Sequence, residues 1–346
     1  MREMWTCGDA AAMRGLVFQA PQRVKHRAGK MPAVVYCAML SSMPAVARID
    51  PKTVFTPEEW APLAARSSWR GLMHVAGCWA LIFLAGAVFV VWPNPLTYVL
   101  AVMIIGAREL GLAILMHDAA HGALHPNQKI NDWVGEWLCA APVGARLESY
   151  RAYHLKHHRF TEQPEDPDLS LSAPFPITRT SLQRKMIRDL TGQTFLKQRT
   201  AQLFGGRKSG EVVNASVGHF LFVNLILFAI VTFAGVWWTY PALWIVAMAT
   251  WFPLVTRLRN IAEHACVKTE DDPFTHARTT HANPLERLFI APYWVHYHGE
   301  HHVFMHVPCY NLPRTHALLM QKGYGARMRV APGYASVLKQ ATSRAA

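Results

Sequence analysis

The chain has 346 residues, of which 51% are hydrophobic and 16% are charged, and its formal net charge is +13. Soluble domains carry about 25% charged residues, so this composition argues against an ordinary soluble protein. The six cysteines are scattered, and none forms a CxxC pair. This argues against a disulfide scaffold and against a cysteine-based metal site.

Residues 1–45 show no clear periodicity and are predicted to be a poorly ordered N-terminal extension. Four apolar stretches follow, at about residues 72–92, 96–116, 218–240 and 242–255. Each is long enough to cross or deeply enter a bilayer about 30 Å thick. We expect one domain over residues 46–330 and a C-terminal tail over residues 331–346.

The four stretches fall into two pairs. Pro93-Asn94-Pro95 separates the first two, and Thr239-Tyr240-Pro241 separates the last two. Proline and asparagine at such points are typical of turns. The predicted fold is an all-α integral membrane protein with four transmembrane helices in two hairpins.

Basic residues avoid the apolar stretches: of the 35 lysines and arginines, only Arg108 lies within one. The others lie before the first pair, between the two pairs and after the second pair. This positive-inside pattern predicts cytoplasmic termini and a cytoplasmic central loop. It explains the net charge better than a nucleic-acid partner does. Since no endoplasmic retention signal is evident, a bacterial inner membrane is preferred.

Histidines form three clusters with related spacings, two or three to a cluster. On a helix, residues three or four apart share a face, so their imidazoles can converge. Eight such imidazoles exceed the needs of one ion and predict a binuclear metal site on the cytoplasmic side. The clusters are His117 and His121; His154, His157 and His158; and His298, His301 and His302.

Neutral imidazoles without cysteine suit iron, zinc, copper or nickel, and disfavour calcium and magnesium. A structural zinc ion needs four ligands, and a hydrolytic zinc ion uses three with water. Eight histidines exceed both needs unless two zinc ions are bound. Nitrogen ligands beside a membrane suggest dioxygen activation directed at a lipid C–H bond, but spacing alone leaves iron and zinc open.

The HxxxH, HxxHH and HxxHH boxes, in this order around two hairpins, resemble the membrane-bound fatty acid desaturase superfamily. The similarity spans about residues 70–325. It implies a helical bundle whose cytosolic helical cap holds two iron ions, with dioxygen as co-substrate. It also implies desaturation of a lipid-linked or thioester acyl chain. No electron-carrier domain is visible, so a separate ferredoxin or cytochrome b5 with its reductase is expected to supply electrons.

The same resemblance directs attention to the segment Arg259-Asn260-Ile261-Ala262-Glu263-His264. In acyl-CoA desaturases a motif of this type supplies a histidine ligand and an asparagine that holds a metal-bound water. By this resemblance, His264 is a ninth histidine ligand and Asn260 a ligand through water. A capping or packing pair remains the alternative.

Carboxylates near the boxes are expected to orient the imidazole N–H groups. The candidates are Asp118, Glu263, Glu300 and the acidic run of residues 165–168, which includes Asp168. The alternative role for Asp168 is to cap the segment that follows it. Arg108 and Glu109 lie inside the second apolar stretch, where ionisable residues are costly. They either line a substrate tunnel or belong to a buried ion pair. Four further histidines are not expected to be ligands; they are expected to contact the ligands, face solvent or support the fold: His125, His296, His306 and His316.

Three other functions stay open at this point. A hydroxylase or ketolase of a carotenoid or other lipid would share the same scaffold. A membrane zinc lipid hydrolase would need neither dioxygen nor an electron donor. A metal transporter fits least, because its polar residues should extend across the spans.

Overall fold

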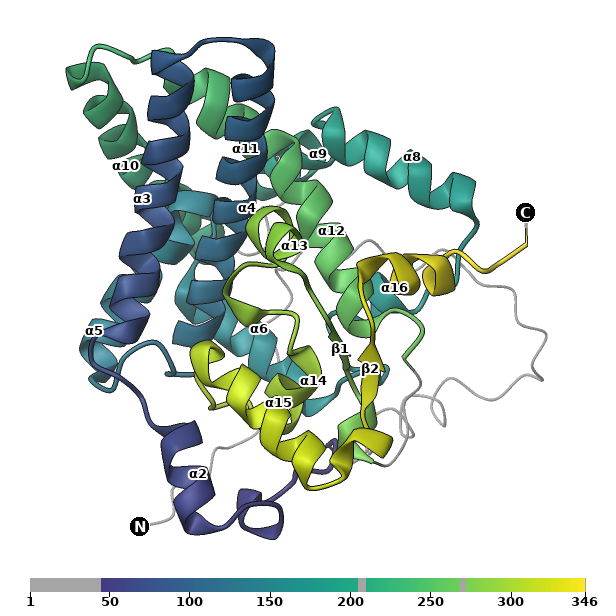
Figure 1. Ribbon diagram of the computed structural model, residues 1–346. Coiled ribbons are helices and arrows are strands. Elements are labelled where there is room, and N and C mark those ends of the chain that lie inside the picture. The colour runs from purple at the N-terminus through teal and green to yellow at the C-terminus, as the bar shows by residue number, and fades with distance from the viewer. Residues whose placement is uncertain (1–44, 205–209, 268–271, 346) are drawn as a thin grey trace.

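A computed structural model describes residues 45–204, 210–267 and 272–345. Residues 1–44, most of the predicted N-terminal extension, lie outside the described residues. Long helices form the upper part of the molecule, and shorter helices with two strands form a cap below them (Figure 1). The predominantly helical fold agrees with the sequence.

The first hairpin consists of α3 (Arg70–Val91) and α4 (Pro95–Ala120). Asn94 begins α4 by accepting hydrogen bonds from the backbone N–H groups of Leu96 and Thr97 at 3.0 and 3.1 Å. An asparagine cap followed by proline is a strong start for a helix. The turn is therefore where the sequence predicts it, and α4 continues four residues beyond the predicted end of the second span.

The second hairpin differs from the prediction at both boundaries. Helix α10 (Gly210–Phe233) ends earlier than the third predicted span. The fourth predicted span is too short, because helical residues continue to His264. They form a π-helical turn, η5 (Tyr240–Ile245), then α11 (Val246–Ala249) and α12 (Trp251–His264).

Two arginines that follow the predicted end of the fourth span, near residue 255, have carboxylate partners. Arg257 Nη2 donates to Asp189 Oδ1 at 2.8 Å, and Arg259 Nε donates to Glu263 Oε1 at 2.7 Å. Because these guanidinium groups are neutralised locally, α12 continues past the end of the hydrophobic run.

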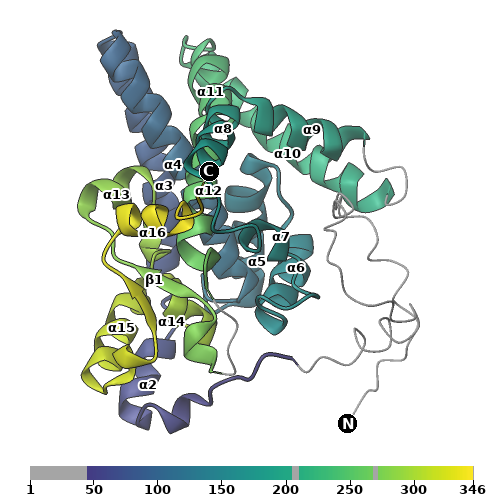
Figure 2. The same cartoon turned by 90° about the vertical axis from the view of Figure 1, so that its right-hand side faces the viewer.

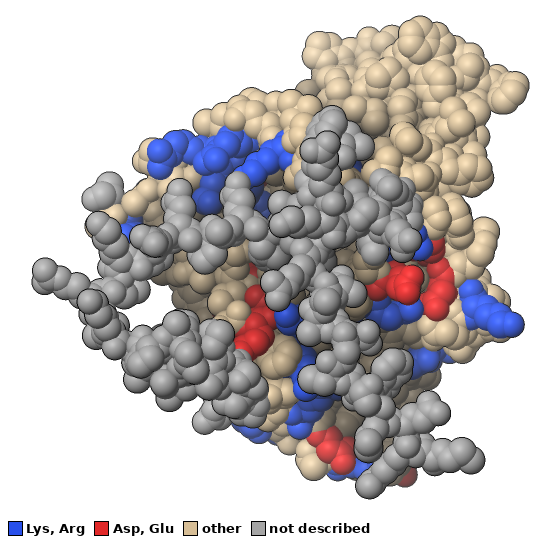
Figure 3. All heavy atoms as spheres, turned by 180° about the vertical axis from the view of Figure 1, so that it is seen from behind, with Lys and Arg blue, Asp and Glu red and all other residues tan. Residues whose placement is uncertain are grey.

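Three helices within the described residues are long and apolar enough to cross a membrane: 70–91, 95–120 and 240–264. The apolar part of α10, Val217–Phe233, is shorter. In the rear view, the projecting upper part carries no charged side chain, whereas Lys, Arg, Asp and Glu are spread below it (Figure 3). These features indicate a membrane protein, and the predicted count of four spans remains a prediction.

The hairpins cross closely. A Cβ atom added to Gly106 in α4 would lie 2.8 Å from the Cβ of Trp251 in α12. Glycine therefore permits the two helices to approach at this point. This contact brings the C-terminal halves of α4 and α12 towards the same region of the cap.

Between the hairpins the chain forms a group of shorter helices on one side of the molecule (Figure 2). They are α5 (Gln128–Val134), π-helical η3 (Gly135–Ala140), η4 (Ala141–Val143), α6 (Leu147–Arg159), α7 (Leu169–Ser172), α8 (Arg179–Leu190) and α9 (Gln193–Phe204).

The rest of the cap comes from both ends of the described chain. The N-terminal elements are η2 (Pro51–Thr53) and α2 (Pro57–Ala64). Those after α12 are η6 (Pro273–Thr275), β1 (Arg278–Thr280), α13 (Pro284–Phe289), η7 (Pro292–Trp294), α14 (His298–Val303), η8 (Cys309–Asn311), α15 (Leu312–Gln321), η9 (Tyr324–Ala326), β2 (Arg329–Ala331) and α16 (Tyr334–Ala341).

The C-terminal segment, expected to be a tail, is part of the fold. β1 and β2 pair in parallel, with Thr279 opposite Val330. After β2, Val337 and Ala341 of α16 are buried in one apolar cluster with Ile261 of α12. A tail was predicted because these contacts join residues distant in sequence.

Candidate metal centre

Nine buried or partly buried histidines from four segments meet where α4, α6, α12 and α14 end or cross. α4 carries His117 in its last turn and is followed by His121. α6 and α14 carry the two HxxHH boxes, and α12 ends at His264. The structure divides the nine into two groups, and within each group the candidate ligand atoms all lie within 4.8 Å of one another.

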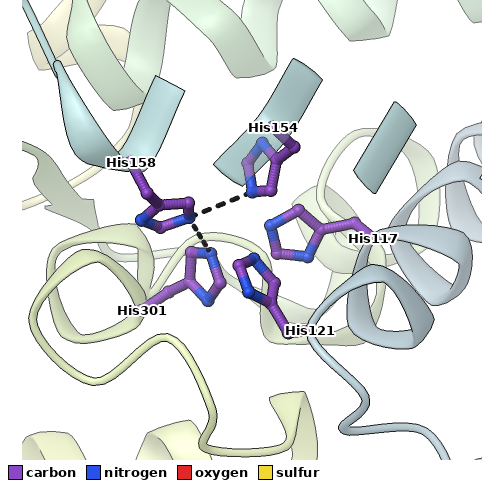
Figure 4. Close-up of side chains that lie close together, drawn as sticks. All are labelled: His117, His121, His154, His158 and His301. Carbon is purple, nitrogen blue, oxygen red and sulfur yellow. Dashed lines mark hydrogen bonds between the residues drawn. The ribbon is translucent and has the colours of Figure 1, made fainter. Parts of the chain in front are cut away.

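The five-histidine group is formed by buried side chains that point toward one another (Figure 4). His158 Nε2 lies 3.0 Å from His154 Nε2 and 2.9 Å from His301 Nε2. Both ring nitrogens of His121 and Nε2 of His117 are buried without a hydrogen-bond partner among the described residues. Buried unpaired nitrogens are costly, and a bound metal ion would satisfy them. The group comprises His117, His121, His154, His158 and His301.

The four-histidine group lies beside the first. His298 Nε2 is 3.0 Å from both His264 Nε2 and His302 Nε2, and His157 Nε2 is 3.3 Å from His302 Nε2. The rings of His158 and His302 are stacked at 4.3 Å between centroids, so the two groups adjoin. The group comprises His157, His264, His298 and His302.

Each of the two HxxHH boxes contributes histidines to both groups, two to one group and one to the other. In α6 the first and third histidines, His154 and His158, join the five-histidine group, and His157 joins the other. In α14 the first and third, His298 and His302, join the four-histidine group, and His301 joins the other. Residues four apart share a helix face, while the middle histidine is rotated from it. One box can therefore supply ligands to two adjacent ions.

Burial keeps most of these imidazoles neutral, which is the form that binds metals. Burial lowers the pKa of His154, His158 and His301 well below its usual value, and neighbouring histidines lower it further. The pKa values of His298 and His302 are lowered for the same reasons.

His157 is the exception because a carboxylate contacts it. Burial lowers its pKa, but hydrogen bonding to Asp166, with the charge of that group, raises the pKa above its usual value overall. The distance from His157 Nδ1 to Asp166 Oδ1 is 2.8 Å. Asp168, the candidate from the acidic run, is 3.7 Å from His157 Nδ1 and accepts a hydrogen bond from the Tyr153 hydroxyl. Asp166 is therefore the closer orienting group.

The other three predicted carboxylates differ in their contacts. Asp118 Oδ1 lies 3.6 Å from His117 Nδ1, and Glu263 Oε2 lies 3.5 Å from His298 Nε2. Glu300 instead accepts from the Thr279 hydroxyl and pairs with His316 Nδ1, both at 2.5 Å. Glu300 therefore contacts His316 of α15, which belongs to neither histidine group.

A small cavity of about 40 Å³ borders the four-histidine group, and Asn260 is in its lining together with His157, His264 and His298. This volume is sufficient for water, which suits the role predicted for Asn260. Glu162, which the sequence did not single out, also lines the cavity, and burial raises its pKa to about 7. No spacing signal marks Glu162, because its position depends on the loop after α6.

Arg108 and Glu109 do not form an ion pair with each other or with any other described residue. Arg108 Nη2 donates to the backbone carbonyls of Arg287 and Leu288 at 3.3 and 2.8 Å. The carboxylate of Glu109 is buried, and neither oxygen has a hydrogen-bond partner among the described residues. Glu109 and Arg199 of α9 interact electrostatically without a contact within 4.0 Å. Both interpretations, a tunnel lining and a buried ion pair, therefore stay predictions.

The histidines that were not predicted to be ligands lie outside both groups. His306 Nδ1 is 3.3 Å from the His121 carbonyl, and His125 Nδ1 accepts from the backbone N–H of Asn127 at 2.9 Å. His296 is buried next to the ring of Tyr297.

The sequence is similar to three proteins of known activity. The chain is 28% identical over 256 residues to a dihydrorhizobitoxine desaturase of Bradyrhizobium elkanii, covering 69% of this chain and 70% of that protein. It is 26% identical over 249 residues to a β-carotene ketolase of Paracoccus sp. (strain PC1), covering 69% and 87%. It is 24% identical over 291 residues to an sn-1 oleoyl-lipid 12-desaturase of Synechocystis sp., covering 77% and 79%.

The family model for fatty acid desaturases matches residues 93–333, which include every histidine of the two groups. The resemblance noted from the three boxes is thereby confirmed, and with it the assignment to the oxidoreductases. The chain belongs to the fatty acid desaturase family.

Proposed function

We propose that the chain is a dioxygen-dependent desaturase of an acyl chain, acting through two iron ions bound by the nine histidines. The observation that carries the proposal is the pair of adjacent buried histidine groups, with five and four imidazoles. Structural zinc is saturated by four ligands, so the larger group favours an ion that accepts more than four. Two bound iron ions would supply the redox chemistry for activating dioxygen.

Electron balance requires an external donor. Desaturation takes two electrons and two protons from adjacent carbons, whereas reducing dioxygen to two waters takes four electrons and four protons. A separate ferredoxin, or cytochrome b5 with its reductase, supplies the remaining two electrons, and the remaining two protons come from water. The chain's own residues hold the ligand nitrogens in place, with Asp166 orienting His157 through the 2.8 Å contact.

We infer that the site faces the cytoplasm, most simply at a bacterial inner membrane with four spans and both termini inside. The support is the distribution of charge: all basic residues but Arg108 lie outside the apolar stretches. In the rear view, the upper part shows no charged side chain, in contrast to the part below it (Figure 3). The histidine groups lie at the charged end of α4.

Hydroxylation or ketolation of a carotenoid or other lipid is the second candidate. It is favoured by the similarity to a β-carotene ketolase, which covers 87% of that protein. Desaturation and hydroxylation can begin with the same hydrogen abstraction, so the histidine geometry suits both. The product distinguishes them.

The test is product analysis by mass spectrometry in a host supplied with isotopically labelled dioxygen and a competent donor. An acyl product lighter by two hydrogens, without labelled oxygen, supports desaturation; labelled oxygen in the product indicates the hydroxylase or ketolase. His301→Ala should abolish either product, and iron analysis should show reduced binding. His281→Ala is the matched control, since His281 is exposed and belongs to neither group. A hydrolysed lipid formed without dioxygen would contradict the proposal.

A further inference from the structure

A second, larger cavity lies away from the two histidine groups, between α3, α4 and the segment containing α13 and η7. Its volume is about 310 Å³, within the range of small-ligand pockets. Its lining combines two arginines with a histidine and two aromatic rings: Arg108, Arg287, His74, Tyr293 and Trp294. Figure 1 shows α13 beside α4, between the upper helices and the lower cap.

Arg108 gives this cavity an unbalanced positive charge. The residue is only 5% exposed, and no described carboxylate lies within 4.0 Å of its guanidinium nitrogens. Its Nη2 donates to the Leu288 carbonyl at 2.8 Å, but its Nε is buried and has no partner among the described residues. A buried charge without a counterion is strongly unfavourable. An anion entering the cavity would supply both the charge and the missing acceptor.

Both guanidinium groups of the cavity lie over aromatic rings that line it. Arg108 Cζ is 5.7 Å from the ring centroid of Tyr293, and Arg287 Cζ is 5.1 Å from that of Trp294. Tyr293 and Trp294 have φ angles of 52° and 57°, a conformation uncommon for bulky residues. Such strain concentrates at ligand-binding sites. The Tyr293 hydroxyl donates to the His74 carbonyl at 3.1 Å, which ties this wall to α3.

We propose that the cavity binds the anionic end of the substrate, a carboxylate or phosphate group, between Arg108 and Arg287. This rests on the proposed function, because it identifies the cavity as the far end of the same substrate site. Nine residues of α4 separate Arg108 from His117, about 13.5 Å at the rise of an α-helix. An extended hydrocarbon chain can reach over that distance. Guanidinium groups bind both anions through paired N–H donors.

An anion site at Arg108 favours substrates that carry a negative charge. An acyl compound with a free carboxylate or a phosphate would find a partner for Arg108, whereas a neutral carotenoid hydrocarbon would leave its charge unpaired. The two anionic sources differ in their head groups, so they can be compared on one alkyl chain.

The experiment measures binding of radiolabelled dodecanoate, dodecyl phosphate and dodecanol to the iron-loaded protein in nanodiscs, with empty nanodiscs as background. The wild-type chain should bind an anionic ligand about tenfold more tightly than dodecanol. Tighter binding of dodecanoate identifies the carboxylate, and tighter binding of dodecyl phosphate identifies the phosphate. Equal binding of all three would overturn the proposal.

Two substitutions place the effect at the cavity. Arg108→Gln should weaken anion binding about tenfold while leaving a donor for the Leu288 carbonyl. Arg287→Gln, at an exposed position less prone to misfolding, should weaken it about threefold because solvent screens its charge. Arg314→Gln, an exposed control in α15, should have no effect. Unchanged anion binding in folded Arg287→Gln and Arg108→Gln proteins would reject the site.

A last arm separates this site from the metals and from the proposed function. His301→Ala should lose oxidation but retain the preference for the anion. Loss of that preference would place the anion at the metal ions and overturn the proposal. If the wild-type protein selects the anion but oxidises no acyl chain, the proposed function fails while the anion site stands. If the protein oxidises an acyl chain without selecting the anion, the anion site fails while the proposed function stands.

Discussion

The two histidine groups use the same ligand type in different surroundings. All five side chains of the larger group are buried, and the nearest carboxylate, Asp118, is 3.6 Å from His117. The smaller group has one histidine fewer and contacts Asp166 and Glu263. It contributes three histidines to the lining of a cavity to which the larger group contributes only His154. We expect the smaller group to hold the ion with more exchangeable ligand positions, where water or dioxygen has access.

The sharpest way to break this comparison is to remove one histidine from each group. His298→Ala leaves three histidines in the smaller group, and we expect loss of roughly one of the two iron ions and at least about a 100-fold fall in product. His121→Ala leaves four in the larger group and should retain more iron. Iron per chain, measured by elemental analysis of purified protein, checks this.

The His281→Ala protein provides the control for folding and for surface-bound iron in that experiment. Equal iron loss in the two variants would contradict the difference between the groups. Retention of both ions in His298→Ala would show that this histidine is not a ligand.

The box histidines could be identified from sequence because each box is local. Residues three and four apart on a helix lie on neighbouring faces whatever surrounds them. Their division between two groups could not be predicted, since it depends on how α6 crosses α14. In that crossing, His157 faces the group of His298, while His301 faces the group of His154.

Other features were missed where distant contacts override a local pattern. The predicted fourth span ends just before Arg257, but Asp189, 68 residues earlier, pairs with this arginine and the helix continues. The C-terminal helix was missed because the pairing of β1 with β2 brings it onto α12. Asp166 and Asp168 could not be ranked, because the turn after α6 decides which of them reaches His157.

A smaller effect is expected from the carboxylate that distinguishes the smaller group. Asp166→Asn removes the charge 2.8 Å from His157 Nδ1 while keeping the size of the side chain. Losing such an orienting group lowers metal affinity about 10- to 100-fold. Asp168→Asn, whose carboxylate is 3.7 Å away, should have a smaller effect. Competition with a chelator measures both. The comparison fails if Asp168→Asn releases iron as readily as Asp166→Asn.

The mildest test uses the pH dependence of the metal-free protein, in which the two groups differ through His157. The pKa values of His154, His158 and His301 are lowered by burial, so folding disfavours their protonation. Stability from such groups is fully present above the unfolded pKa, about 6.5, and falls as the pH drops below it. Since the lowered imidazoles outnumber the raised one, the melting temperature should fall on acidification from pH about 7.5 to about 5.5.

His157 opposes this trend because its pKa is raised. Its contribution is fully present below about pH 6.5 and is lost as the pH rises through its folded pKa. Asp166→Asn removes the contact that raises this pKa, so the metal-free variant should lose more stability at about pH 5.5 than at about pH 7.5. Thermal unfolding of both proteins at the two pH values measures the difference. An equal loss at both values would mean that Asp166 supports the fold without acting on the protonation of His157.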